Sequence, residues 1–181
     1  KFSFALFFLF HPLTSVYSYT YYKSATYIEI SNLAEKNHRQ LTDYTRSREH
    51  IMQNIHLAND RDGFFVQDVY CRIKYRRNIG PRKMPSHTII NIEHTWPKSR
   101  FNAGKGSKKY TIMKSDLHHL YPTDSKTNSK RGNYYFSNLS QTDSLAGECR
   151  CSKFGRDPRD YKFAFEPPVE HKGNVARALF Y

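Results

Sequence analysis

A glutamate and a histidine stand side by side at the end of an apolar, strand-like stretch, TIINIEHT. The carboxylate of Glu93 is a hard oxygen ligand for a divalent cation. The imidazole of His94, with an ordinary pKa of about 6.5, is the side chain best suited to taking a proton from water. Alternation along a strand sends neighbouring side chains to opposite faces, so both reach one site only if the strand ends or bulges at Glu93, which Pro97 favours. The alternative is a solvent-facing Glu93 and a semi-buried His94.

A second oxygen ligand is expected in the stretch PTDSKTNSKRGN. Thr123 or Asp124 can cap a short helix over residues 124–131, and Gly132 fits the position that ends one. Asn128 then lies near the middle of this helix, where asparagine competes for backbone hydrogen bonds and needs another reason to be present. A carboxylate and an amide oxygen suit Mg²⁺, with Ca²⁺ or Mn²⁺ as alternatives. With so few protein ligands, we expect one ion that keeps waters and binds substrate phosphate oxygens.

The charge of the chain favours an anionic partner. Lys and Arg number 29 against 16 Asp and Glu, which gives a formal net charge of +13 over 181 residues, and 15% of the residues are aromatic. Basic and aromatic residues together suit phosphate pairing and base stacking in nucleic acid. The basic segment 71–86 contributes Arg82 and Lys83 as candidate phosphate contacts, although a solvated loop is an equal alternative. A surface that binds polyanions only incidentally remains open.

The remaining elements predict one mixed α+β domain over residues 19–181. Apolar spacing predicts a long helix from Asn32 to about Leu57, followed by a strand in FFVQDVY and a strand over residues 88–95. The segment KSRFNAGKGSKKY is predicted to be a loop, and a final helix is expected to begin near Gly173. Trp96 is predicted to pack in the core, with base stacking as the alternative.

The N-terminal segment and the cysteines indicate export. Residues 1–18 carry one basic residue and an apolar block that is shorter than the ~20 residues of a membrane span, which is typical of a secretory signal peptide. An apolar core segment is the alternative. In an oxidising compartment, Cys71 is expected to pair with Cys149 or Cys151, because those two are too close in sequence to pair without strain. We expect a periplasmic or secreted monomer without stable membrane association.

Three segments, NIEHTWPKS, SDLHHLYPTDSKTNSKRGN and FEPPVEHKGNVARALFY, resemble the bacterial endonuclease I family of secreted or periplasmic nucleases. The matching segments run from about Tyr70 to the C-terminus. The resemblance implies a His-Me finger (ββα-metal) motif with flanking helices, in which His94 activates water while Glu93 and Asn128 hold the metal ion. It also implies an arginine at the scissile phosphate, assigned to Arg100 with Arg131 second, and 5′-phosphate products.

Several further residues complete this hypothesis. Asp116, His118 and His119 match the family and are predicted to orient His94 or the metal ligands, with contact to substrate by one histidine as the alternative. Lys105 joins Arg131 as a candidate nucleic-acid contact. No pattern of base-reading side chains is present, so cutting of DNA and also RNA with little sequence preference is expected. The competing hypotheses are a secreted basic protein that binds nucleic acid without cutting it, and a zinc site of His118 or His119 with Cys149 and Cys151.

Overall fold

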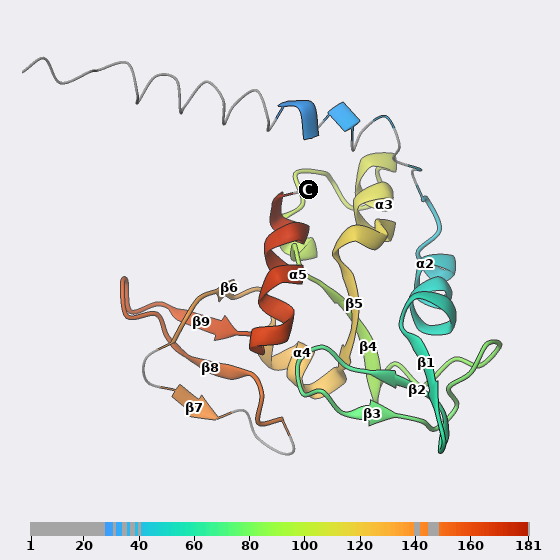
Figure 1. Cartoon of the computed structure of the whole chain (residues 1–181). Helices are drawn as coiled ribbons and strands as arrows, with labels where there is room; N and C mark the ends of the chain where they lie inside the picture. Colours follow the sequence, from blue (N-terminus) through green and yellow to red (C-terminus); the bar gives the residue numbers. More distant parts are fainter. Residues whose placement is uncertain are drawn as a thin grey trace, which may run out of the picture. The chain divides into compact units, whose positions relative to one another are not determined.

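The computed structural model describes residues 28–30, 32–33, 36, 39, 41–139, 142–144 and 149–180 (Figure 1). The chain divides into two units, Lys1–Arg39 and Gln40–Tyr181. In the first unit, the described residues 28–30, 32–33 and 36 are helical, whereas the expected signal segment 1–18 lies outside the described residues. Within the part of the chain that is described, no helix has the length and apolar character needed to cross a bilayer.

The second unit is a mixed α+β structure, as predicted. Its described strands form a β1-β2-β3 sheet, a β4-β5 pair and a β6-β9-β8-β7 sheet. In chain order the elements are α2 (Tyr44–His50), the π-helical η1 (Ile51–Ile55), β1 (Leu57–Asp60), β2 (Gly63–Gln67), β3 (Lys74–Tyr75), β4 (Ile90–His94), the 3₁₀ turn η2 (Lys98–Arg100), α3 (Lys108–Ser115), the 3₁₀ turn η3 (Leu117–His119), β5 (Leu120–Asp124), α4 (Ser125–Arg131), β6 (Tyr135–Phe136), β7 (Thr142–Ser144), β8 (Lys153–Arg156), β9 (Phe163–Glu166) and α5 (Val169–Phe180).

The single long helix predicted over residues 32–57 is wrong. Residues 41–43 are not helical, and Asp43 begins a new helix by accepting the backbone N–H groups of Thr45 (2.9 Å) and Arg46 (3.2 Å). Beyond η1 the chain turns into the β1–β2 hairpin, in which Gly63 adopts a φ of +98°. The missed signals are an aspartate at a helix start and the Asp-Gly pair of a turn, both of which apolar spacing ignores.

The strands β4 and β5 form an antiparallel pair in the second unit. Its antiparallel register runs without a bulge from Ile90 opposite Asp124 to His94 opposite Leu120. Ile90 and Ile92 lie on the face expected from alternation, and with Leu120 they join a buried cluster. The helix α4 follows β5 directly and packs against both strands (Figure 1). This packing brings Asn128 of α4 next to Ile92, near the end of β4.

Two sequence expectations around this pair need correction. The segment predicted as a loop after Pro97 contains η2 and the start of α3, which Ser107 caps by accepting the backbone N–H of Tyr110 (3.1 Å). Trp96 is not a core residue, because it is 40% exposed and its indole N–H donates to the Arg100 carbonyl (3.2 Å). The final helix, α5, begins four residues before the predicted Gly173.

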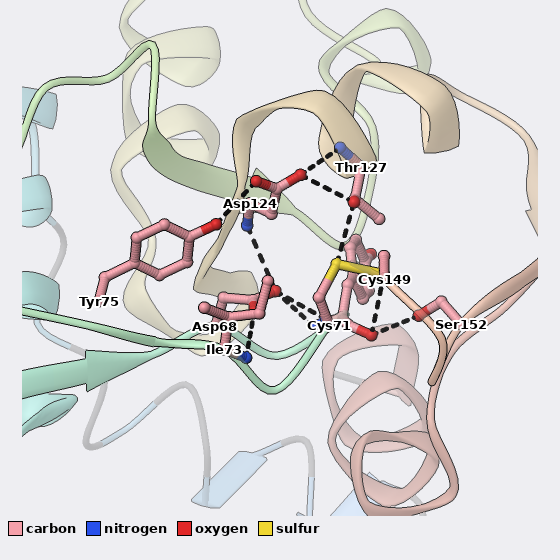
Figure 2. The surroundings of a disulfide bond; sticks show 9 residues. Asp68, Cys71, Ile73, Tyr75, Asp124, Thr127, Cys149 and Ser152 are labelled. Atoms are coloured by element: carbon pink, nitrogen blue, oxygen red, sulfur yellow. Dashed lines mark hydrogen bonds between the residues drawn. A yellow bond between two sulfur atoms is a disulfide. The ribbon is translucent and has the colours of Figure 1, made fainter. Parts of the chain in front are cut away.

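A disulfide joins Cys71 to Cys149, and Cys151 is free and exposed (Figure 2). This confirms the expectation that Cys71 pairs with one of the two neighbouring cysteines. The bond lies in a second buried cluster with Tyr70, Phe154 and Phe165. It therefore ties the segment after β2 to the segment before β8.

The carboxylate of Asp68 fixes the start of α4. It accepts backbone N–H groups from Tyr70 (2.9 Å), Cys71 (2.8 Å), Ile73 (2.9 Å) and, at 3.3 Å, Asp124 (Figure 2). Asp124 in turn caps α4 by accepting the backbone N–H of Thr127 (2.8 Å), as predicted for this position. One buried acid therefore links the disulfide-bonded turn to the helix that carries Asn128.

Candidate active site

A cleft of about 710 Å³ lies at the end of β4. It brings together Glu93, His94 and Asn128, the three residues that the sequence analysis placed at one metal site. The complete lining is Tyr44, Arg48, His87, Asn91, Ile92, Glu93, His94, Pro97, Lys98, Ser99, Asn128, Ser129, Arg131, Gly132 and Asn133.

His94 is buried and held as a neutral imidazole. Its Nε2 lies 3.0 Å from the carbonyl oxygen of Lys114, which can only accept, so Nε2 carries the hydrogen and Nδ1 keeps the lone pair. The ring packs against Tyr44 (5.4 Å between centroids), His119 (5.4 Å) and Phe101 (6.2 Å). Burial, with a smaller effect of His119, lowers the pKa of His94 to about 3. Near neutral pH the ring is therefore uncharged, and Nδ1 keeps its lone pair.

Glu93 is buried on the other side of the strand. Its Oε1 accepts the Tyr70 hydroxyl (2.8 Å) and lies 3.0 Å from Nη1 of Arg131, and the side chains of Glu93 and Arg131 are only 3% and 2% exposed. Burial raises the pKa of Glu93 to about 7, against the opposing effects of Arg131 and the Tyr70 hydroxyl. The carboxylate also interacts with the backbone N–H of His94, and Oε2 has no side-chain donor in the described part of the chain.

The amide of Asn128 is oriented by the neighbouring strand. Its Nδ2 donates to Asn91 Oδ1 (2.8 Å) and to the Ile92 carbonyl (3.3 Å). Because both amide hydrogens are used, the side-chain oxygen is turned away from β4, and it accepts no hydrogen bond from any described residue. This arrangement accounts for an asparagine in the middle of a seven-residue helix.

These donors fit a hard divalent cation. One carboxylate oxygen and one amide oxygen in a shared cleft are the ligand types that Mg²⁺, Ca²⁺ and Mn²⁺ prefer. The described residues contain no group of three or more His, Cys, Asp or Glu that could hold a metal ion, so an ion bound here would take its other ligands from water or substrate. The zinc site proposed from Cys149 and Cys151 is wrong, since Cys149 is bonded to Cys71 and has no thiolate to offer.

The strand does not need the bulge that the sequence suggested. Glu93 and His94 point to opposite faces of a regular pair of strands, yet both line the cleft. The expected strand end at Glu93 is not found either, because β4 continues for one residue beyond it and ends at His94. At a strand end, the cleft can extend around the edge and reach both faces.

The two arginines considered for the scissile phosphate lie in different surroundings. Arg100 is absent from the cleft lining; its Nη2 donates to the Asn133 carbonyl (2.6 Å) and its guanidinium lies 3.8 Å from the Tyr135 ring. Arg131 lines the cleft, but its guanidinium is turned into the protein, where Nη2 donates to the Thr95 carbonyl (2.9 Å). Its burial against Glu93 leaves almost no surface for contact with nucleic acid.

Of the other predicted residues, His119 lies next to the site. It is buried against His94, and its Nε2 donates to the Met113 carbonyl (2.7 Å). Asp116 accepts the backbone N–H of His118 (3.0 Å), and the His118 side chain is half exposed. Three cations predicted to contact nucleic acid are exposed residues outside the cleft lining, namely Lys105, Arg82 and Lys83.

The sequence analysis missed the basic residues that do line the cleft. Arg48 from α2 and Lys98 from η2 make no side-chain hydrogen bond or ion pair with any described residue, and His87 lies in the same lining. The sequence contained one indication of them: Arg48 interrupts the apolar face of its helix, and a charged residue in such a position indicates a role other than packing. With the charge of Glu93 offset by Arg131, these cations leave the cleft positive.

Comparison with known proteins places the chain in a family. A family model described as Endonuclease I matches residues 15–181. An extracellular ribonuclease of Bacillus amyloliquefaciens is 30% identical over 164 residues, which are 90% of this chain and 52% of that protein. An extracellular ribonuclease of Bacillus subtilis (strain 168) is 36% identical over 93 residues, 50% of this chain and 27% of that protein.

A third relative carries the name of the family. Endonuclease-1 of Buchnera aphidicola subsp. Acyrthosiphon pisum (strain APS) is 31% identical over 99 residues, 54% of this chain and 37% of that protein. The chain spans about half of the length of these relatives, or less. Because the family model covers most of the sequence, including the whole cleft, the chain belongs to the Endonuclease I family.

Proposed function

We propose that the chain is a metal-dependent endonuclease that hydrolyses phosphodiester bonds with little sequence preference. The observation that carries this proposal is the cleft itself, in which the open Nδ1 of His94 shares one space with the oxygen ligands of Glu93 and Asn128. The strands β4 and β5 followed by α4 have the order of elements expected of a ββα-metal finger. A positive cleft with a base and two hard ligands suits attack on a phosphate.

In this mechanism His94 is the general base. The Lys114 carbonyl fixes the ring through Nε2–H, so that Nδ1 faces the attacking water and takes its proton. A divalent ion held by Glu93 and Asn128, which we take to be Mg²⁺, would supply the positive charge that stabilises the departing 3′ oxygen and leaves a 5′ phosphate. Arg131 and Tyr70 hold the Glu93 carboxylate in place for this task.

The cations beside the scissile phosphate are proposed to be Arg48 and Lys98. Both line the cleft without a protein partner among the described residues, whereas Arg100 is occupied by Asn133 and Tyr135 outside it. Phosphate contacts position a nucleic acid but read no sequence. Cleavage is therefore proposed to be sequence-indifferent.

The substrate is proposed to be DNA and also RNA. Two relatives are named ribonucleases and a third an endonuclease, and a site that holds a phosphate and a metal ion has no means of rejecting a 2′ hydroxyl. The names of the Bacillus relatives and the disulfide support action outside the cytoplasm, in the periplasm or after secretion. All proposed groups come from one chain, so a monomer suffices.

The test is cleavage of supercoiled plasmid and of a structured RNA with Mg²⁺ and with EDTA. Cutting by the wild type with Mg²⁺ alone, and a loss of at least about 100-fold in His94→Ala, are the expected results. His50→Ala, which changes an exposed histidine of α2 outside the cleft, is the matched control and should cut normally. Full activity in His94→Ala would remove the assignment of the base. A mobility shift with intact plasmid under both conditions would favour the alternative, a basic nucleic-acid-binding protein.

A further inference from the structure

Asn91 lines the cleft two positions before Glu93 on β4, so the two side chains share one face of the strand. The helix α4 packs against β4 and presents Ser125, Asn128 and Arg131, which are spaced three residues apart along one side of the helix. Arg131 pairs with Glu93 (3.0 Å), and the other two residues of α4 both form hydrogen bonds with Asn91. The strand that carries one proposed metal ligand is therefore joined through Asn91 to the helix that carries the other.

A backbone carbonyl determines which way the two asparagine amides point. The Ile92 carbonyl can only accept a hydrogen bond, so the atom of Asn128 that lies 3.3 Å from it is the nitrogen. The same nitrogen lies 2.8 Å from Asn91, which must therefore face it with its oxygen. The nitrogen of Asn91 is then left to donate to the Ser125 hydroxyl (3.1 Å). The hydrogen-bond network thus fixes both side chains in one orientation.

This orientation matters because the two ends of an amide group differ as ligands. The oxygen can bind a hard cation, whereas the NH₂ group only donates hydrogen bonds. If the Asn128 amide rotated by half a turn, its NH₂ group would take the place of the oxygen in the cleft. The Ile92 carbonyl and the Asn91 oxygen oppose this rotation, because each would then face the Asn128 oxygen without a hydrogen atom between them. Partners that orient a metal ligand in this way contribute about 10- to 100-fold to metal affinity.

We propose that Asn91 is a positioning residue for the metal ion: it holds the Asn128 amide with its oxygen toward the cleft, where Glu93 supplies the second ligand. This inference rests on the proposed function of the cleft. Asn91 is not itself a ligand, because its oxygen accepts from the Asn128 amide and its nitrogen donates to Ser125. Loss of Asn91 should therefore weaken binding of the cation without removing either ligand.

Binding of Mn²⁺ alone, without nucleic acid, is measured by the loss of the free-ion signal in electron paramagnetic resonance. Asn91→Leu, which keeps the size of the side chain but removes both polar atoms, should weaken Mn²⁺ binding by about 10- to 100-fold. The matched control is Asn54→Leu, which changes an exposed asparagine of η1 whose amide bonds to His50 outside the cleft. This control should bind Mn²⁺ as the wild type does.

The Asn128→Asp background separates positioning from a general effect on the fold. A carboxylate presents an oxygen in either orientation, so it needs no partner to turn it toward a cation. In this background Asn91→Leu should weaken Mn²⁺ binding by no more than about twofold. Unchanged affinity in Asn91→Leu alone, or an equal loss in both backgrounds, would overturn the proposal.

Cutting of plasmid by the wild type is measured in parallel. A wild-type protein that binds Mn²⁺ and cuts plasmid, combined with either contrary result, would refute the role of Asn91 alone. A wild-type protein that does neither would refute the proposed function as well.

Discussion

Replacement of Arg131 by methionine should destabilise the protein strongly. Arg131 and Glu93 form an ion pair of 3.0 Å with both side chains almost fully buried. Loss of the guanidinium leaves a carboxylate without its counter-charge and also removes the donor to the Thr95 carbonyl (2.9 Å). Breaking a buried pair in this way costs about 3–5 kcal/mol. For a domain of this size the melting temperature should then fall by about 6–20 °C.

Urea unfolding followed by circular dichroism, in EDTA, measures this loss. The matched control is Arg61→Met, which breaks an ion pair of 3.8 Å with Asp62 in which the side chains are 93% and 63% exposed, so that we expect a much smaller loss of stability. The double variant Glu93→Gln with Arg131→Met should recover part of the lost stability, because no buried charge remains. An Arg131→Met protein as stable as Arg61→Met would refute the burial of this pair.

Three further predictions follow from the described contacts. Arg48→Gln should lower kcat/KM on plasmid by about tenfold and reduce the slope of log affinity against log salt by about 1, whereas Arg46→Gln, which changes an exposed arginine of the same helix, should do neither. Burial lowers the pKa of His171 from 6.5 to about 4, so the unfolded chain binds a proton at a higher pH than the folded chain does. As the pH falls from 6.5 to 4, the free energy of unfolding should therefore decrease by up to about 3 kcal/mol. His171→Phe should show a smaller decrease over the same pH range, measured by urea unfolding. Replacing Cys71 and Cys149 by serine should cost about 2–5 kcal/mol, and reductant should lower the melting temperature of the wild type but not of this variant.

The features that the sequence predicted correctly depend on local chemistry. The helix α4 was predicted because Thr123 or Asp124 could cap its start and Gly132 could end it; Asp124 is the cap in the structure, and Gly132 has a φ of +57°. The pairing of Cys71 with one of two neighbouring cysteines followed from the geometry of a disulfide. The meeting of Glu93 and Asn128 in one cleft was expected because both are hard ligands without a better local explanation.

The features that were missed depend on partners distant in the sequence. The residues next to Arg131 in the sequence do not indicate that its guanidinium is buried. Its burial depends on Glu93, 38 positions earlier, and on carbonyl groups at the end of β4. The cleft cation Arg48 was missed because its place depends on how α2 lies beside β4. The break before Asp43 was missed because apolar spacing continues across it and only the capping side chain marks it.

The disulfide also determines whether the two fragments stay joined after a protease cuts the chain once. Cys71 and Cys149 are 78 positions apart, and the covalent ring that they close contains Glu93, His94 and Asn128. The exposed turn at residues 104–107 lies inside that ring. Cleavage of one peptide bond there would produce two polypeptides still joined through sulfur, which separate on a gel only after reduction. A nicked molecule would thus keep its base and both oxygen ligands in one particle.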